Sequence, residues 1–134
     1  MSGDPVRGYL LDTHTALWAT SRPERLSDSA LQAIYAGPVF LSVVAYWEIT
    51  IKCMKGSLQV QQLETWWADA LLKLGAFPLL LQAEHINMLQ TLPPHHKDPF
   101  DRILIAQAIA ENHTLISMDQ AVQHYSEAGL HVIS

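Results

Sequence analysis

Residues 9–20 read YLLDTHTALWAT, a stretch that joins a short apolar run to a helical pattern. The run 9–11 is apolar throughout and ends abruptly at Asp12, so it predicts a buried strand followed by a turn. From residue 13 to residue 20 the apolar side chains have helical spacing, which predicts a helix directly after the strand. A short strand that is apolar on both faces and leads into a helix is typical of a parallel sheet.

The rest of the chain repeats this alternation of strands and helices. Further strands are predicted at 39–41, 77–81, 114–117 and 131–133. Helices are predicted at 43–54, 62–74, 83–92 and 98–111, and two more follow Ser27 and Asp119, which are suitable N-caps. We therefore expect an α/β fold of three layers, in which helices flank a central, mostly parallel sheet of four or five strands.

Length and composition predict a single domain spanning 1–134, with 1–8 as a flexible N-terminal segment. A chain of 134 residues corresponds to about one domain, and 49% hydrophobic residues against 16% charged ones exclude intrinsic disorder. The single cysteine, Cys53, excludes a disulfide framework and a zinc module built from several cysteines. No apolar run is long enough to span a bilayer, and the first eight residues lack a signal-peptide pattern, so we expect a cytoplasmic protein.

The charge balance restricts the ways in which this protein could bind nucleic acid. Thirteen acidic residues against eight Lys and Arg give a net charge of −5, which argues against binding through a basic patch. A nuclease that depends on bound metal is still compatible with this balance, because divalent cations would offset several of the carboxylates.

Two aspartates follow predicted strands. Asp12 comes after the strand 9–11, and Asp119 comes shortly after the strand 114–117. Ligands bind at the carboxyl ends of parallel strands, so both residues are candidates for a functional site. Each also precedes a predicted helix, and a simple role as helix N-cap is the alternative.

Glu48 is the only charged side chain in the stretch 41–51. A carboxylate buried in such surroundings must be paired, bound to a metal or protonated, because burial of a bare charge is too costly. The alternatives are that Glu48 points to solvent or pairs with Lys52, four residues further along the helix.

Asp98 and Asp101 are spaced three residues apart, so both can lie on one side of a helix start. Asp98 precedes Pro99, as expected of an N-cap, and Asp101 could simply complement the helix dipole. Four acids from separate elements repel one another unless a cation compensates them, and oxygen ligands favour Mg²⁺ or Mn²⁺. Such a site could activate water for attack on a phosphodiester. The four are Asp12, Glu48, Asp101 and Asp119.

Four motifs carry a resemblance to a known family. They are LLDTH at 10–14, SVVAYWEI at 42–49, HHKDPFDRILIAQA at 95–108 and LISMD at 115–119. At these residues the chain resembles PIN domains, in particular the VapC-type toxin ribonucleases of bacterial toxin–antitoxin modules. The resemblance extends from about residue 9 to residue 133, and the third motif is its most specific part.

This resemblance implies a PIN-like fold, an endoribonuclease that acts as a toxin, and Mg²⁺ or Mn²⁺ as cofactor. It also implies an RNA substrate, a cognate antitoxin, a homodimer and no membrane association. The catalytic and metal-binding residues would be Asp12, Glu48, Asp101 and Asp119. Residues expected around them, or in contact with the substrate, are Asp98, Thr13, His14, Arg102 and Ser117, the last of which stands where the family often has threonine.

The roles of several neighbouring residues are open to two interpretations. His14 either contacts a phosphate or has a structural role, and Arg102 either neutralises a phosphate or tethers Asp98. His95 and His96 are expected at the rim of the cleft, since adjacent residues do not face each other as a zinc pair would. The alternative function for the whole chain is a catalytically silent PIN-like module that binds another protein.

Overall fold

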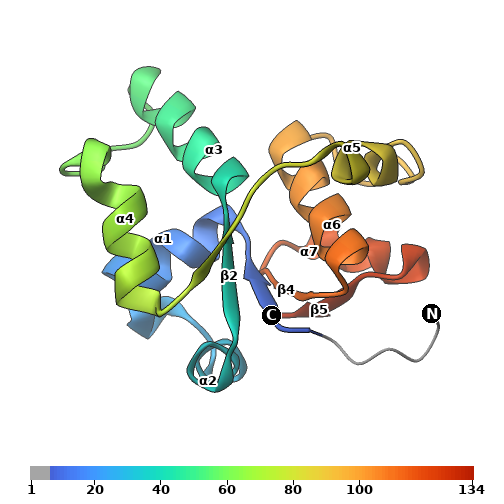
Figure 1. Cartoon of the computed structure of the whole chain (residues 1–134), viewed down its shortest axis with the longest axis horizontal. Coiled ribbons are helices and arrows are strands. Elements are labelled where there is room, and N and C mark those ends of the chain that lie inside the picture. Colours follow the sequence, from blue (N-terminus) through green and yellow to red (C-terminus); the bar gives the residue numbers. More distant parts are fainter. Residues whose placement is uncertain (1–6) are drawn as a thin grey trace.

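The computed structural model describes residues 7–134, in which short strands alternate with helices (Figure 1). The strands are β1 (Tyr9–Leu11), β2 (Val39–Ser42), β3 (Phe77–Leu79), β4 (Thr114–Ile116) and β5 (His131–Ile133). The helices are α1 (Thr13–Ser21), α2 (Asp28–Ala36), α3 (Val43–Met54), α4 (Leu63–Leu74), α5 (Ala83–Leu89), α6 (Pro99–Glu111) and α7 (Gln120–Gln123). Two short 3₁₀ helices complete the described chain, η1 (Pro23–Arg25) and η2 (His124–Ala128).

The five strands of this part of the chain form one parallel sheet in the order β3-β2-β1-β4-β5. The chain adds β2 and β3 on one side of β1 and then returns to place β4 and β5 on the other side. The carboxyl ends of all the strands therefore share one edge, and the direction of winding reverses between β1 and β4. That switch point is where open α/β sheets bind their ligands.

Helices cover both faces of the sheet, which confirms the expected three layers. Successive strand residues point to opposite faces. Leu10 and Leu115 therefore pack into a core with α5 and α6, whereas Leu11 and Ile116 pack into a second core with α1, α2 and α4. Figure 1 shows the same division, with α1 and α4 on one side of the sheet and α5 and α6 on the other.

Two predicted elements extend at least two residues beyond their bounds in the structure. The strand expected at 77–81 ends at Leu79, because its partner β2 ends at Ser42, where the chain turns into α3. The helix expected at 83–92 ends at Leu89. Pro93 disfavours a helical backbone at the residue before it, so the last turn does not form.

The start of the described chain is tied to the sheet. Of the segment 1–8 that we expected to be flexible, residues 1–6 lie outside the described residues. The amide of Arg7 donates to Asn112 O at 3.0 Å, and Gly8 O accepts from Thr114 N at 2.9 Å. A Cβ on Gly8 would lie 2.6 Å from Pro38 O, so a larger residue would force the two segments apart. Among the described helices, none combines the length and apolar character needed to cross a membrane.

Candidate active site

Asp12 lies at the switch point of the sheet, directly after β1. Its amide donates to Ile116 O at 3.2 Å, which ties the end of β1 to the end of β4. Its Oδ1 accepts a hydrogen bond from Thr15 N at 2.9 Å, so the carboxylate is the N-cap of α1. Only 7% of Asp12 is exposed. The capping interpretation is therefore confirmed, and the buried charge is still available at the edge of the sheet.

Glu48 is buried in α3, with 3% of its surface exposed, and both of its oxygens have partners. Thr13 Oγ1 donates to Oε1 at 2.5 Å, and Lys52 Nζ lies 2.8 Å from Oε2. The hydrogen bond to Glu48 is the main cause that raises the pKa of Lys52, which keeps that ammonium charged. Glu48 thus pairs with Lys52 as one alternative foresaw, and the solvent-facing alternative is wrong. The bond from Thr13 links α1 to α3 beside Asp12.

Asp98 and Asp101 begin α6. Asp98 Oδ1 accepts from Phe100 N at 2.8 Å and from Asp101 N at 3.4 Å, which confirms that Asp98 is the N-cap of this helix. Asp101 lies in the first turn, as its spacing from Asp98 predicted. Asp98 already satisfies free amides in the first turn of the helix, so the carboxylate of Asp101 is not needed for the cap. It lies close to the acids of the neighbouring elements.

Asp119 follows β4 and caps α7, where its Oδ1 accepts from Ala121 N at 2.9 Å. The hydroxyl of Ser117, which is fully buried, accepts from Asp119 N at 3.2 Å and so orients the turn. Asp119 is the most exposed of the predicted acids, with 41% of its side chain accessible. Burial opposes its ionisation, but hydrogen bonds from His96 and Ala121 outweigh that effect and hold the pKa of Asp119 below its usual range.

His96 connects the last two acids. Its Nε2 lies 2.8 Å from Asp119 Oδ2 and 3.0 Å from Asp101 Oδ2. Its Nδ1 accepts a hydrogen bond from Asp98 N at 3.1 Å. A backbone N–H can only donate, so Nε2 carries the ring proton and donates it to the two carboxylates. His96 therefore lies inside the acidic cluster, deeper than the rim position that the sequence suggested.

The pKa of Asp101 reflects both its burial and the negative charges around it. It is raised from 3.8 to about 7, first by burial and then by the charges of Asp98, Glu48 and Asp12, while His96 opposes the shift. Three other carboxylates are thus close enough to Asp101 to disfavour its ionisation, and His96 ties Asp119 to the same group. The structure brings the four predicted acids together from four separate elements.

Arg102 does not tether Asp98, which was one of its two expected roles. Its guanidinium donates to Pro93 O at 3.0 Å, to Tyr125 Oη at 3.1 Å and to Leu92 O at 3.4 Å. The same Tyr125 hydroxyl accepts from His96 N at 2.9 Å. Arg102 and Tyr125 therefore anchor the loop that carries His96, and Arg102 supports the cluster through this loop.

The two adjacent histidines diverge, and a third lies on α1. His95 packs against His124 and Tyr125, with ring centroids 5.7 and 5.2 Å apart, whereas His96 turns to the acids. His14 is exposed on the first turn of α1, its ring 6.0 Å from that of Trp18, and its charge contributes to the lowered pKa of Asp119. Sequence reasoning underestimated His96, whose only local signal was its place two residues before the cap Asp98.

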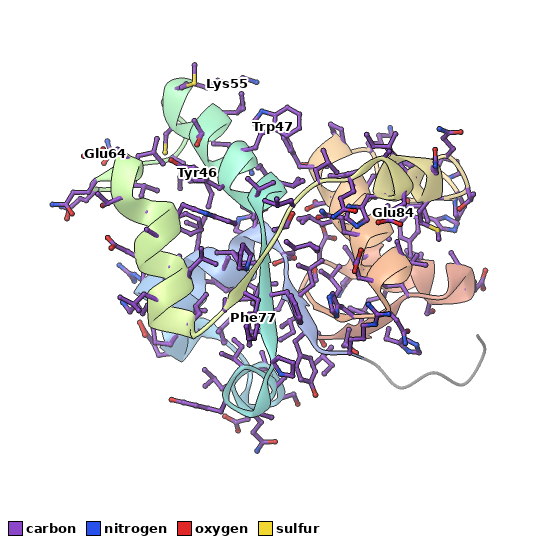
Figure 2. All side chains as sticks on the ribbon, in the orientation of Figure 1. Tyr46, Trp47, Lys55, Glu64, Phe77 and Glu84 are labelled. Carbon is purple, nitrogen blue, oxygen red and sulfur yellow. The ribbon has the colours of Figure 1, made fainter. Side chains whose placement is uncertain are left out.

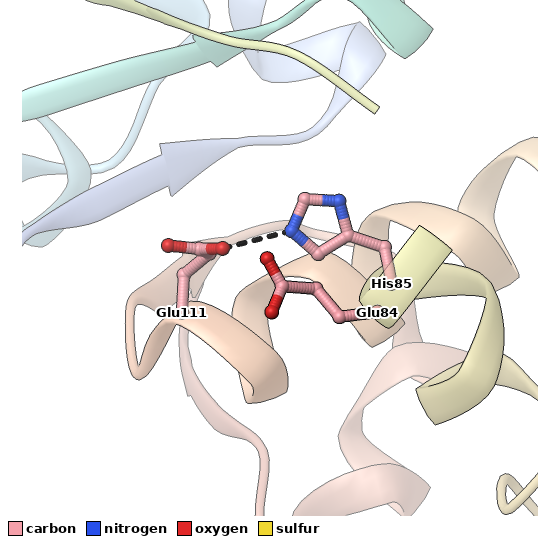
Figure 3. Close-up of side chains that lie close together, drawn as sticks. All are labelled: Glu84, His85 and Glu111. Atoms are coloured by element: carbon pink, nitrogen blue, oxygen red, sulfur yellow. Dashed lines mark hydrogen bonds and ion pairs between the residues drawn. The ribbon is translucent and has the colours of Figure 1, made fainter. Parts of the chain in front are cut away.

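A second acid–histidine group lies near the far end of α6 (Figure 3). His85 is fully buried, and its Nε2 lies 2.8 Å from Glu111 Oε2, while the nearby Glu84 is exposed. The Nδ1 of His85 accepts from Gln82 N at 3.1 Å and lies 3.3 Å from Gln107 Nε2, so Nε2 carries the proton here too. Because that proton already goes to Glu111, His85 joins α5 to α6 and is not available as a metal ligand.

The donors at the main cluster fit a hard divalent cation. The ligand atoms of His96, Asp101 and Asp119 lie within 4.8 Å of one another, and the Nε2 of His96 is occupied by its proton. The available donors are therefore carboxylate oxygens, which suit Mg²⁺ or Mn²⁺. The raised pKa of Asp101 supports the same conclusion, because burial and then repulsion by Asp98, Glu48 and Asp12 disfavour its ionised form, and a bound cation would favour that form.

Two sequence comparisons relate this chain to known proteins. The model of the PIN domain family matches residues 9–128. Ribonuclease VapC22 of Mycobacterium tuberculosis (strain ATCC 25618 / H37Rv) is 26% identical over 121 residues, which cover 87% of this chain and 90% of the relative.

Two solved structures share the fold. One is the VapBC2 complex of Rickettsia felis bound to a DNA fragment from its promoter, with a TM-score of 0.66 and 16% identity over 93% of this chain and 96% of that one. The other is FitAcB of Neisseria gonorrhoeae, with a TM-score of 0.62 and 16% identity over 94% and 96% of the two chains. At this level of identity, the two structures establish the architecture alone.

Proposed function

The chain belongs to the PIN domain family, and we propose that it is a divalent-metal-dependent endoribonuclease that acts as the toxin of a type II toxin–antitoxin module. The convergence of Asp12, Glu48, Asp101 and Asp119 at the switch point of the sheet carries this proposal. The similarity to a named ribonuclease along nearly the whole chain supports RNA as the substrate. The likeness to toxin–antitoxin complexes supports a cognate antitoxin as partner.

The four acids would hold one or two Mg²⁺ or Mn²⁺ ions. A bound cation supplies a water molecule of lowered pKa and offsets the negative charge that develops on the phosphate. Glu48 is kept in place by Thr13 and Lys52, and Asp12 and Asp119 by the amides of the helices they cap. Asp101 or Glu48 would orient the attacking water, and Asp98, Ser117 and His96 hold the surrounding backbone and carboxylates in position.

A homodimer in the cytoplasm completes the proposal. Trp47 on α3 (Figure 2) is 53% exposed and packs edge-on against Phe100, with ring centroids 5.0 Å apart, so an exposed aromatic side chain lies beside the start of α6. A second copy that covers this side chain would bring two acidic sites into one assembly. Light scattering of the purified chain, compared with a Trp47→Ser variant, tests the dimer.

Cleavage assays test the nuclease directly. We expect the purified protein to cut RNA in Mg²⁺ or Mn²⁺, to stop in EDTA, and to lose activity in Asp12→Asn. Glu84→Gln is the matched control, because it removes one exposed carboxylate from the other acid–histidine group. Cleavage that survives both EDTA and Asp12→Asn would refute the proposal, and failure to bind Mn²⁺ in calorimetry would favour a catalytically silent binding module.

Expression in bacteria tests the toxin. We expect growth arrest when the chain is expressed alone, and relief when the neighbouring open reading frame is expressed with it. Harmless expression of a protein that is an active nuclease in vitro would contradict the toxin part of the proposal while leaving the enzyme intact.

A further inference from the structure

A groove of about 730 Å³ lies between α1 and α4. Its walls are the exposed side of α1, η1, the loop 58–62 and one face of α4. The groove begins at His14, two residues after Asp12, and continues along α1 to Arg22 and Arg25. It therefore leads away from the acidic cluster along the helix that Asp12 caps. We refer to it as the α1–α4 groove.

The charge of this groove is opposite to that of the whole chain. Arg22, Arg25 and Lys73 line it, whereas Asp69 is the one carboxylate among its lining residues. The full sequence has only eight Lys and Arg against thirteen acids, so three of the eight cations gather along one groove. Lys73 Nζ donates to Thr20 O at 2.6 Å, which fixes its ammonium at the wall. A polyanion that enters the acidic cluster would meet its counter-charges here.

Aromatic rings accompany these cations. The guanidinium of Arg25 lies 5.8 Å from the ring centre of Trp18, and both side chains line the groove. Trp66 lines the opposite wall and stacks on Tyr46, with ring centroids 6.0 Å apart and planes 18° apart, which holds the indole in place. Paired arginines and half-buried tryptophans are the components with which proteins bind unpaired nucleotides, because every base can stack on them.

We propose that the α1–α4 groove binds the single-stranded RNA that flanks the scissile phosphate, with Arg22 and Arg25 on backbone phosphates and Trp18 and Trp66 against bases. The inference rests on the proposed function, since it assigns the path of the substrate to that same site. Continuity with Asp12 through α1, together with the local excess of cations, favours RNA over a protein segment as the occupant. A double helix presents no free bases to the tryptophans, so the groove would discriminate against it.

Binding measured without cleavage tests the groove. The probe is a fluorescein-labelled single-stranded RNA of mixed sequence, about 12 nucleotides long, titrated in EDTA so that no cation supports hydrolysis. We expect the double variant Arg22→Ala/Arg25→Ala to raise the Kd about tenfold or more. The logarithmic salt dependence should also become shallower by about 1.4, because each lost phosphate contact on a single strand contributes about 0.7.

Two controls separate a groove contact from a general charge effect. Arg7→Ala/Lys55→Ala removes the same charge outside the groove, since Lys55 lies beyond the end of α3 (Figure 2), and it should change the Kd less than about twofold. Arg22→Lys/Arg25→Lys keeps both charges and should recover most of the affinity. Both arginines are exposed, so thermal melting should show that every variant folds.

The outcomes of these measurements distinguish failure of the groove from failure of the proposed nuclease. Equal Kd values for the groove variant and the Arg7/Lys55 control would overturn the inference. So would a groove variant that binds RNA normally but no longer binds the antitoxin, because the groove would then be a protein-docking surface. A chain that binds RNA through Arg22 and Arg25 but never cleaves it with any metal would refute the proposed nuclease and still support the groove.

Discussion

The two ends of α6 carry two acid–histidine groups that look alike and differ in their charge balance. In both, a backbone amide donates to Nδ1 of the histidine, so Nε2–H donates to a carboxylate. At the far end, His85 donates to one carboxylate, that of Glu111, which also lies 4.0 Å from Arg7. At the near end, His96 meets two carboxylates, and three more charges act on Asp101. A satisfied network stabilises the fold, whereas an excess of charge calls for a ligand.

The largest contrast is expected in catalysis. Asp101→Asn should lower kcat/KM for RNA at least about a hundredfold, because it removes a proposed metal ligand from the cluster. It should also abolish Mn²⁺ binding in calorimetry. Glu111→Gln removes a carboxylate from the other end of the same helix and should leave both quantities within about twofold. Equal losses of activity and Mn²⁺ binding in Asp101→Asn and Glu111→Gln would contradict the proposed difference between the two acid–histidine groups.

For the free energy of unfolding, we expect the group at the far end of α6 to be the more important one. His85→Ala should lower the free energy of unfolding by about 3 kcal/mol, because it leaves a cavity and deprives Gln82 N, Gln107 and Glu111 of their partner. Urea denaturation measures this loss, and His131→Ala, at an exposed position, should cost less than about 0.5 kcal/mol. A loss at His85 no larger than that at His131 would contradict the structural role.

The metal-free protein should respond to pH through Asp101. Its pKa in the folded state, about 7, is raised above the ordinary value of 3.8, so the folded state binds its proton more tightly than the unfolded state. The resulting stability is complete below about pH 4 and is lost as the pH rises through 7. In EDTA, the free energy of unfolding should fall by about 1–2 kcal/mol from pH 5 to pH 7.5, after allowance for partial exposure.

Two comparisons check the origin of this slope. Asp101→Asn should flatten it, and saturating Mn²⁺ should remove it, because a cation favours the ionised carboxylate. Denaturation series at several pH values, with and without Mn²⁺, provide the measurement. If the pH dependence of the unfolding free energy persists in Asp101→Asn, another titratable group causes it and this prediction is wrong.

The smallest effect is expected from His96. His96→Ala removes the donor between Asp101 and Asp119 and should cost about 1 kcal/mol in EDTA, but less in Mn²⁺, where the cation offsets the repulsion. His96→Gln offers an amide donor at similar reach and should restore much of the loss. Nitrogen-15 NMR should show the proton on Nε2 in both His85 and His96. A proton on Nδ1 of His96 would contradict the hydrogen bond from Asp98 N.

Local signals explain why so much of this molecule could be predicted from its sequence. The boundary at Asp12 and the caps at Ser27 and Asp98 each depend on chemistry within a few residues. The aspartates could be singled out because each follows a strand or lies at the start of a helix, and parallel strands end at one edge. Glu48 could be singled out because it is the only charged side chain in an apolar stretch.

What escaped prediction depends on contacts between distant residues. The place of His96 is set by Tyr125, 29 residues away, and that of Arg102 by a loop with no periodicity. The early end of β3 follows from the length of β2, and the α1–α4 groove exists only because two helices pack side by side. A pattern within one segment carries no information about any of these.

The single helix shared by the two groups also constrains how this chain can change in length. Asp101 and Gln107 face different partners six residues apart on α6, a distance of about 9 Å along its axis. One inserted or deleted residue between them would turn one end by about 100° relative to the other. Gln107 accepts a hydrogen bond from Ser42 Oγ at 2.6 Å and contacts His85 Nδ1. Either the acids or these contacts of Gln107 would then lose their register, so the stretch 102–106 should resist insertions that the loop 55–62 accepts.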